Sequence, residues 1–145
     1  MPISPFLPAH RLAALIRQKK VGCLELLDSY LKRVERYNPK LNAVIVLDTE
    51  RARKRARAAD RALAKGEARG PLHGVPMTIK ESFDVAGLPT TWGRAELKDN
   101  IPTRDALAVE RLQRAGAVLF GKTNVPRLLA DWQTFNPIHG TTNNP

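Results

Sequence analysis

The feature that most constrains this chain is the alternation of helical segments with short apolar runs. Apolar residues recur at helical spacing in four segments, which are 8–19, 23–37, 51–69 and 105–115. Three short apolar runs follow the last three of these segments, and they are AVIVL at 43–47, VPMTI at 75–79 and AVLF at 117–120, of which the first two lie between helical segments. The first run comes after the second helical segment. Runs of this length and composition are typical of buried strands. Helices that alternate with short buried strands predict an α/β fold whose sheet is covered by helices on both faces.

Turn residues predict where several of these elements begin and end. Asn38-Pro39 is expected to close the second helix, and either Asp48 or Thr49 is suited to cap the third. Gly116 is expected to end the fourth helix. A short helix is expected from Pro126 to about residue 131, because proline is favoured at a first helical position.

Size and composition indicate one ordinary globular domain. The chain has 145 residues, of which 43% are hydrophobic. It has neither a stretch long enough to span a membrane nor a secretory signal, so we expect a cytoplasmic protein without a membrane partner. Cys23 is the only cysteine and is expected in the core, and His10, His73 and His139 are widely separated. We therefore expect neither a metal site nor a cofactor.

The basic charge is concentrated in one helical segment. The chain has 24 Lys and Arg against 14 Asp and Glu, a formal charge of +10, and much of it lies in residues 51–69. There, one helical stripe is apolar, and it consists of Ala52, Ala56, Ala59 and Leu63. No aromatic residue interrupts the segment to stack on bases, so a solvated helix is favoured over a nucleic-acid site.

The stretch GAVLFGKT, from Gly116 to Thr123, has the letters of a nucleotide phosphate loop. A phosphate loop must turn tightly so that its amides converge on the anion, whereas AVLF is continuous strand. We therefore interpret residues 121–124 as the turn that leaves a strand, and Lys122 as structural or solvent-facing.

A long irregular segment, 70–93, surrounds the strand that ends at Lys80. Irregular chain of this length often carries function. A lysine at a strand end can extend to water or pair with Glu81 or Asp84. Alternatively, an ammonium held at a buried strand end loses hydration, and the neutral amine can then accept a proton from a hydroxyl nucleophile.

Four segments of the sequence together resemble the first part of the amidase signature family. They are GPLHGVPMTIKESFDVAG, LPTTWG, AGAVLFGKTNVP and FNPIHGTTNNP. The resemblance covers essentially the whole chain and implies the N-terminal portion, residues 1–145, of a single amidase domain. It also implies that the chain forms part of an α/β/α sandwich around a mixed sheet.

The resemblance implies a catalytic role for Lys80 in hydrolysing the C–N bond of a small or aryl-substituted amide. In the family such a lysine acts through a second serine, joined by a cis peptide bond, to activate a nucleophilic serine. Leu128, Leu129 and Ala130 match positions that line the acyl channel, although an ordinary short amphipathic helix explains each of them equally well.

One part of the family pattern does not occur in these residues. A Gly- and Ser-rich segment that supplies both serines and the oxyanion amides follows a motif like TTNNP in the family, and the sequence printed here reaches only Pro145. We therefore expect this chain alone to be inactive. Its expected partners are a small-molecule amide and either further copies of itself or a complementing chain that supplies the missing half. Two alternatives stay open: an A-subunit-like part of a tRNA-dependent amidotransferase, and a non-catalytic fragment that acts through a partner.

Overall fold

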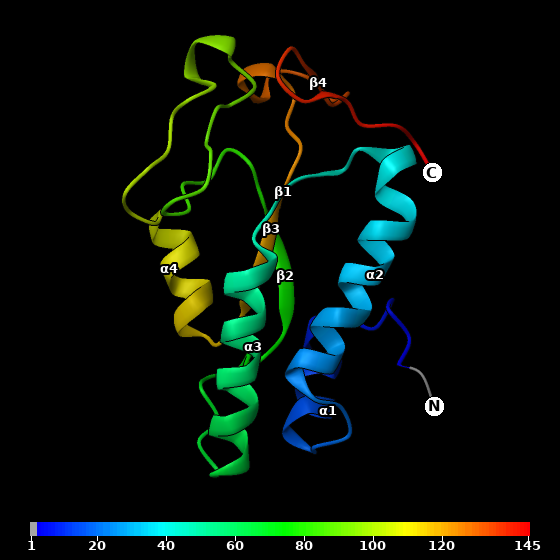
Figure 1. Ribbon diagram of the computed structural model, residues 1–145, viewed down its shortest axis with the longest axis vertical. Coiled ribbons are helices and arrows are strands. Elements are labelled where there is room, and N and C mark those ends of the chain that lie inside the picture. Colours follow the sequence, from blue (N-terminus) through cyan, green and yellow to red (C-terminus); the bar gives the residue numbers. More distant parts are fainter. Residues whose placement is uncertain (1–2) are drawn as a thin grey trace. The chain divides into compact units, whose positions relative to one another are not determined.

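The computed structural model describes residues 3–145, in which helices and strands alternate along the chain (Figure 1). The α-helices are α1 (Ala9–Arg17), α2 (Cys23–Leu41), α3 (Thr49–Ala64) and α4 (Leu107–Arg114). The strands are β1 (Val44–Leu47), β2 (Pro76–Lys80), β3 (Val118–Thr123), β4 (Phe135–Asn136) and β5 (Gly140–Thr141). Two 3₁₀ turns are η1 (Ala95–Leu97) and η2 (Arg127–Leu129). The predicted α/β class is confirmed.

Three strands form a mixed sheet in the order β1-β3-β2. β1 is antiparallel to β3, with Val44 opposite Thr123. β2 runs in the same direction as β3, because Val118 N–H donates to Val75 O at one end and Glu81 N–H donates to Thr123 O at the other. A second, two-stranded antiparallel sheet pairs β4 with β5.

The central position of β3 explains its apolar sequence. Residues 118–122 are all buried, as expected for a strand with neighbours on both sides. The amides of this segment serve the sheet, so the segment is not a phosphate loop. The strand is longer than predicted, since it continues through Gly121 and Lys122 to Thr123 instead of turning at Gly121. Gly121 allows this close pairing, because a Cβ there would lie 2.4 Å from Val46 O.

Three predicted helix boundaries are wrong. The third helix was predicted to reach residue 69, and α3 ends at Ala64. α2 continues through Asn38 and Pro39 to Leu41, because a proline in the last turn removes only a single hydrogen bond near the helix end. The helix ends where Asn42 takes a left-handed backbone, φ 52°. The expected helix after Pro126 is only the 3₁₀ turn η2, because Leu128 and Leu129 also have left-handed backbones.

The chain divides into two compact units. The first comprises the described residues up to Arg33 together with Asp48–Met77 and Leu112–Phe120. Its α3 presents a buried alanine stripe, Ala52, Ala56, Ala59 and Ala62, in which Ala62 takes the place predicted for Leu63. Cys23 is buried as predicted, and Gly74 packs so closely on it that a Cβ at Gly74 would lie 2.1 Å from its sulfur.

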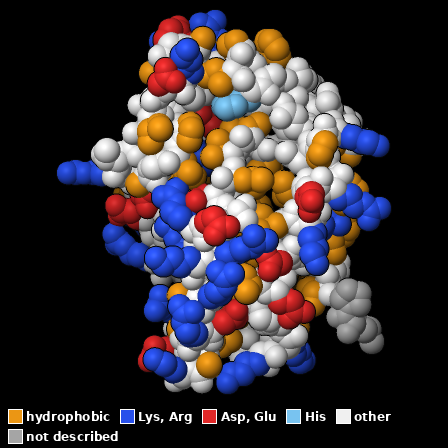
Figure 2. All heavy atoms as spheres, in the orientation of Figure 1, with side chains coloured by type: hydrophobic (Ala, Val, Ile, Leu, Met, Phe, Trp, Pro, Cys, Tyr) orange, Lys and Arg blue, Asp and Glu red, His pale blue; other side chains and the backbone are white. Residues whose placement is uncertain are grey.

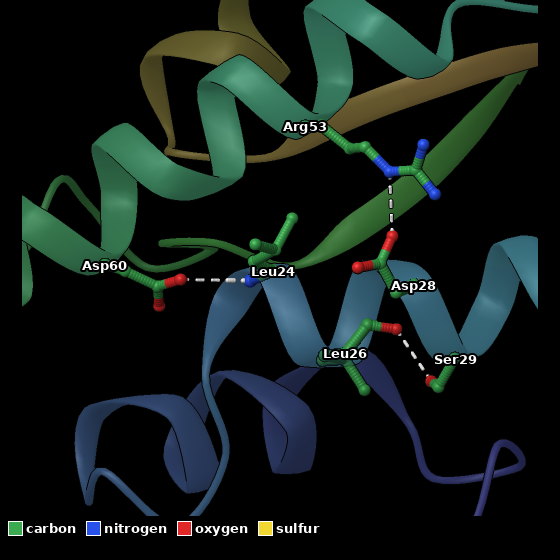
Figure 3. Close-up of polar contacts among 6 residues, drawn as sticks. All are labelled: Leu24, Leu26, Asp28, Ser29, Arg53 and Asp60. Carbon is green, nitrogen blue, oxygen red and sulfur yellow. Dashed lines mark hydrogen bonds and ion pairs between the residues drawn. The ribbon is translucent and has the colours of Figure 1, made fainter.

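Polar contacts fasten α3 to the beginning of α2 within this unit (Figure 3). Gly22 precedes α2 and has no side chain with which to cap it, so the carboxylate of Asp60 accepts the N–H groups of Cys23 and Leu24 at 2.6 and 3.1 Å. Arg53 donates to Asp28 at 2.9 Å. The cap expected at the start of α3 does not form, because the Asp48 carboxylate pairs with a nearby arginine of α3 instead.

The second unit comprises Val34–Leu47, Thr78–Arg111 and Gly121–Pro145. It contains the end of β2, the loop that follows it and the β4–β5 hairpin, and it therefore contains each residue predicted for the site. Within residues 3–145, no helix combines the length and the apolar character that a membrane crossing requires.

Candidate active site

Lys80 is the last residue of β2, and its side chain is exposed. A turn follows at once, in which Phe83 N–H donates to Lys80 O at 3.0 Å. The burial expected for this amine is therefore not provided by the surrounding chain. The reason is strand alternation: Ile79 and Glu81 point inward, so Lys80 between them points outward.

Glu81 fixes the loop that faces the end of β2. Its side chain is fully buried, and its carboxylate accepts N–H groups from Thr91 at 2.5 Å and Trp92 at 3.0 Å. The left-handed backbones of Trp92 and Gly93, φ 55° and 65°, belong to the turn that carries these amides. Hydrogen bonds to an ionised acceptor are stronger than neutral ones, so this carboxylate holds the turn in one conformation.

Lys122 is buried, which corrects the prediction that it could face solvent. Its exposed fraction is 0%, and its Nζ donates to Pro89 O and, at 2.7 Å, to Thr90 Oγ1. Burial lowers the pKa of Lys122 from its ordinary value of 10.5 to about 8, against the opposing effects of Glu81 and Asp84. Lys122 is therefore a partly desolvated amine, and its two hydrogen bonds hold the loop at Pro89 and Thr90.

Two buried asparagines tie the β4–β5 hairpin to the end of β3. Asn136 donates to Asn124 Oδ1 at 2.8 Å and to Val125 O at 2.7 Å, and its own Oδ1 accepts the amides of Ile138 and His139. Asn124 donates in turn to two acceptors in the β5 segment, which are Gly140 O and Thr142 Oγ1. Asn124 and Asn136 therefore belong to one hydrogen-bond framework that holds the β4–β5 hairpin against the end of β3.

The predicted acyl-channel residues lie close along the chain to this framework. Leu128 N–H donates to Trp92 O at 2.8 Å, and Trp92 N–H donates to Glu81. Two hydrogen bonds thus connect η2 to the residue after Lys80. The side chains of Leu128, Leu129 and Ala130 are exposed and free to meet a ligand or another polypeptide.

His139 has a buried Nε2 without a hydrogen-bond partner in the described part of the chain. Burial lowers the pKa of this imidazole, with Lys122 acting in the same direction and Glu81 opposing it. Buried polar atoms are nearly always paired, with protein groups or with ordered water.

The sequence reasoning identified Lys80 but missed Glu81, Lys122 and the two asparagines. A signal existed for Glu81, because alternation from buried Ile79 places it on the inner face. No local signal identified the amides of Thr91 and Trp92 as donors to Glu81, because their position depends on long-range packing. Across residues 3–145, no three His, Cys, Asp or Glu side chains gather into a group that could hold a metal ion.

Comparison with known proteins places this geometry in one family. The amidase family model matches residues 25–145. The chain is 44% identical over 133 residues to an indoleacetamide hydrolase of Bradyrhizobium diazoefficiens, covering 92% of this chain and 25% of that protein. It is 39% identical over 137 residues to the A subunit of the glutamyl-tRNA(Gln) amidotransferase of Acidothermus cellulolyticus, covering 94% of this chain and 27% of that protein.

A solved structure agrees with the sequence relatives. The crystal structure of an amidase superposes with a TM-score of 0.85 at 38% identity, covering 95% of this chain and 31% of that chain. The chain thus spans about a quarter of the length of the curated relatives it matches. Its sequence, its mixed sheet and these matches together show that the chain belongs to the amidase family.

Proposed function

We propose that this chain contributes Lys80 to an amidase that cleaves the C–N bond of a small or aryl-substituted amide. The observation that carries the proposal is the contrast between an exposed Lys80 and the rigid, buried clamp at Glu81 beside it. An amine on a fixed strand end, open on one side, is suited to meet a hydroxyl presented by another segment.

The two serines are assigned to polypeptide outside these 145 residues. When that polypeptide covers Lys80, water is excluded and the neutral form of the amine is favoured. The amine then accepts a proton through the second, cis-linked serine, and the nucleophilic serine attacks the amide carbonyl. As the C–N bond breaks, that proton passes back to the leaving nitrogen, so the acyl-enzyme forms and a neutral amine leaves. Water then hydrolyses the acyl-enzyme and releases the acid.

Leu128, Leu129 and Ala130 are proposed to contact the acyl group, since their apolar side chains remain exposed. Similarity to an indoleacetamide hydrolase favours an aryl-substituted substrate.

A second candidate is an A-subunit-like role in a multi-chain amidotransferase, with glutamine as the amide. It is supported by the similarity to the A subunit of a glutamyl-tRNA(Gln) amidotransferase. The same lysine would serve, and a partner chain would be required.

The test compares the 145-residue chain with the longer product obtained by reading the coding sequence past the Pro145 codon. Ammonia release is measured from indoleacetamide, a short aliphatic amide and glutamine. We expect no turnover by the shorter chain and turnover of the aryl amide by the longer product. Preferential release from glutamine would support the amidotransferase role instead. Turnover by the 145 residues alone would contradict the assignment of the serines to other polypeptide.

A further inference from the structure

The basic residues of α3 fall into two groups with different surroundings. Near the beginning of the helix, Arg51 pairs with Asp48 at 2.7 Å and Arg53 pairs with Asp28 at 2.9 Å. Arg55, half a turn further on, and Arg69, after the helix, have no ion pair with any carboxylate in residues 3–145. Figure 2 shows Lys and Arg side chains gathered over α3.

Arg55 and Arg69 face the same hollow within the first unit. This hollow has a volume of about 210 Å³, and its lining includes both arginines together with Ala58, His73 and Gly116. No Asp or Glu is among the residues that line it. The hollow is therefore electropositive and has a small apolar wall provided by α3.

His73 holds one side of this hollow in place and adds no charge to it. Its Nδ1 lies 2.8 Å from Arg69 N, and its Nε2 lies 3.1 Å from Ala59 O. A backbone amide can only donate, so Nδ1 carries no proton, and Nε2 must carry the proton that it donates to the carbonyl. The ring is therefore neutral, with both nitrogens occupied, and it anchors the Arg69 backbone to α3.

Gly116 keeps the wall of the hollow tightly packed. Its φ is +96°, and a Cβ on it would lie 2.2 Å from Arg69 O and 2.7 Å from the Cα of His73. Backbone at such close distances cannot shift easily into the space. The hollow is consequently formed before any ligand arrives, which lowers the entropic cost of binding.

A second hollow adjoins the first along the same face of α3. It has a volume of about 180 Å³, shares Ala58 and Arg69 with the first, and adds Arg61, Lys65 and one carboxylate, Glu67. Two adjacent hollows thus collect four cationic side chains and one anionic side chain. Glu67 compensates only part of the repulsion among these cations, and a bound anion would relieve the rest.

We propose that the hollow between Arg55 and Arg69 is a binding site for a phosphate group. A guanidinium presents paired donors that match the oxygens of phosphate, and two of them suit a doubly charged anion. The volume is below the ~300 Å³ at which pockets begin to enclose drug-sized ligands, so only a small oxyanion or the phosphate end of a larger molecule fits. The proposal does not depend on the amidase activity.

The experiment titrates the protein with inorganic phosphate at constant ionic strength, and phosphorus NMR or calorimetry reports the binding. Arg55→Gln with Arg69→Gln removes the two proposed ligands. Lys54→Gln with Arg57→Gln removes two exposed charges from the same helix and is the matched control. We expect saturable binding by the parent and by the control, and an affinity at least ~10-fold lower in the Arg55/Arg69 variant.

A lysine pair, Arg55→Lys with Arg69→Lys, keeps the charge and the fold while losing the paired donors, and we expect it to bind phosphate more weakly than the parent. Adenosine monophosphate and a short oligonucleotide distinguish the source of the phosphate. Displacement of inorganic phosphate by either one identifies the larger ligand and supports the site. Absence of saturable phosphate binding would overturn the proposal. Equal weakening in the two glutamine variants would also overturn it, because it would show diffuse attraction to the whole helix.

Discussion

Lys122 Nζ donates to Thr90 Oγ1 at 2.7 Å, at the end of a lysine side chain that no solvent reaches. This bond joins the central strand β3 to a loop. The next two amides of that loop, of Thr91 and Trp92, donate to Glu81. Two buried, oppositely charged side chains thus hold one loop, Lys122 from β3 and Glu81 from the residue that follows β2. The loop lies beside the strand end that presents Lys80, so its rigidity bears directly on the proposed catalytic geometry.

The lowered pKa of Lys122 predicts a specific pH dependence of stability. The pKa falls from 10.5 to about 8 in the folded state, so between these values the unfolded state binds more protons than the folded state. Stability is therefore expected to rise with pH across this window, by up to about 3 kcal/mol, and the penalty is fully present below pH 8. The measurement is urea unfolding of the parent and of Lys122→Met between pH 7 and 10.5.

At pH 7 two effects of Lys122→Met oppose each other: Pro89 O and Thr90 Oγ1 lose their donor, and the desolvation penalty of the ammonium is removed. We therefore expect the variant to lie within about 2 kcal/mol of the parent at pH 7. As pH rises, the parent should gain stability relative to the variant. Burial raises the pKa of Cys23 to about 12, which has the opposite effect on stability as pH rises. This effect is common to parent and variant, so it cancels in the difference between their free energies of unfolding. A difference that stays constant across the window would contradict the account of Lys122.

Glu81→Gln tests the hydrogen bonds that hold the loop at Thr91 and Trp92 from the residue after β2. The substitution keeps the shape of the side chain but replaces a charged acceptor of two amides by a neutral amide group, only one end of which can accept. We expect a loss of about 1–3 kcal/mol in the free energy of unfolding. Hydrogen exchange at Thr91 and Trp92 should also become faster. Glu96→Gln, at an exposed position of η1, is the control and should change neither quantity.

Gly116→Ala tests the close packing behind the proposed phosphate site. A methyl group there would lie 2.2 Å from Arg69 O, whereas at Gly66 it would meet nothing within 4 Å. Both glycines have positive φ, so each substitution has a backbone cost of about 1–2 kcal/mol. Gly116→Ala should cost at least ~2 kcal/mol more than Gly66→Ala, as measured by thermal or urea unfolding. Equal costs would show that the backbone near Arg69 moves aside.

Local patterns in the sequence predicted most of the secondary structure. The apolar runs around Val46, Ile79 and Leu119 lie in strands as expected, since a short buried run has few other stable conformations. The alanine stripe of α3 was also found, with Ala62 in place of Leu63. Pro39 was misread as a helix end. In the last turn of α2 this proline removes only a single backbone hydrogen bond, and the helix continues to Leu41.

The site was less accessible to sequence reasoning than the fold. The sequence left Lys122 as either structural or solvent-facing, because nothing local reveals that Pro89 and Thr90, more than thirty residues earlier, provide acceptors for its ammonium. Asn136 is similar, since its four hydrogen bonds depend on the hairpin folding back to Asn124 and Val125. Lys80 was singled out by its place at a strand end and by the family resemblance, and its catalytic role stays a prediction.

The most direct test of the central claim is the amidase activity of Lys80→Ala in the polypeptide or complex that contains the two serines. Lys98→Ala removes an exposed lysine of the same unit and is the control. We predict that the Lys80 variant binds amide substrate but loses turnover by on the order of 10⁴-fold, while the control keeps full activity. Turnover by Lys80→Ala within a few-fold of the parent would contradict the proposal that this amine moves the proton.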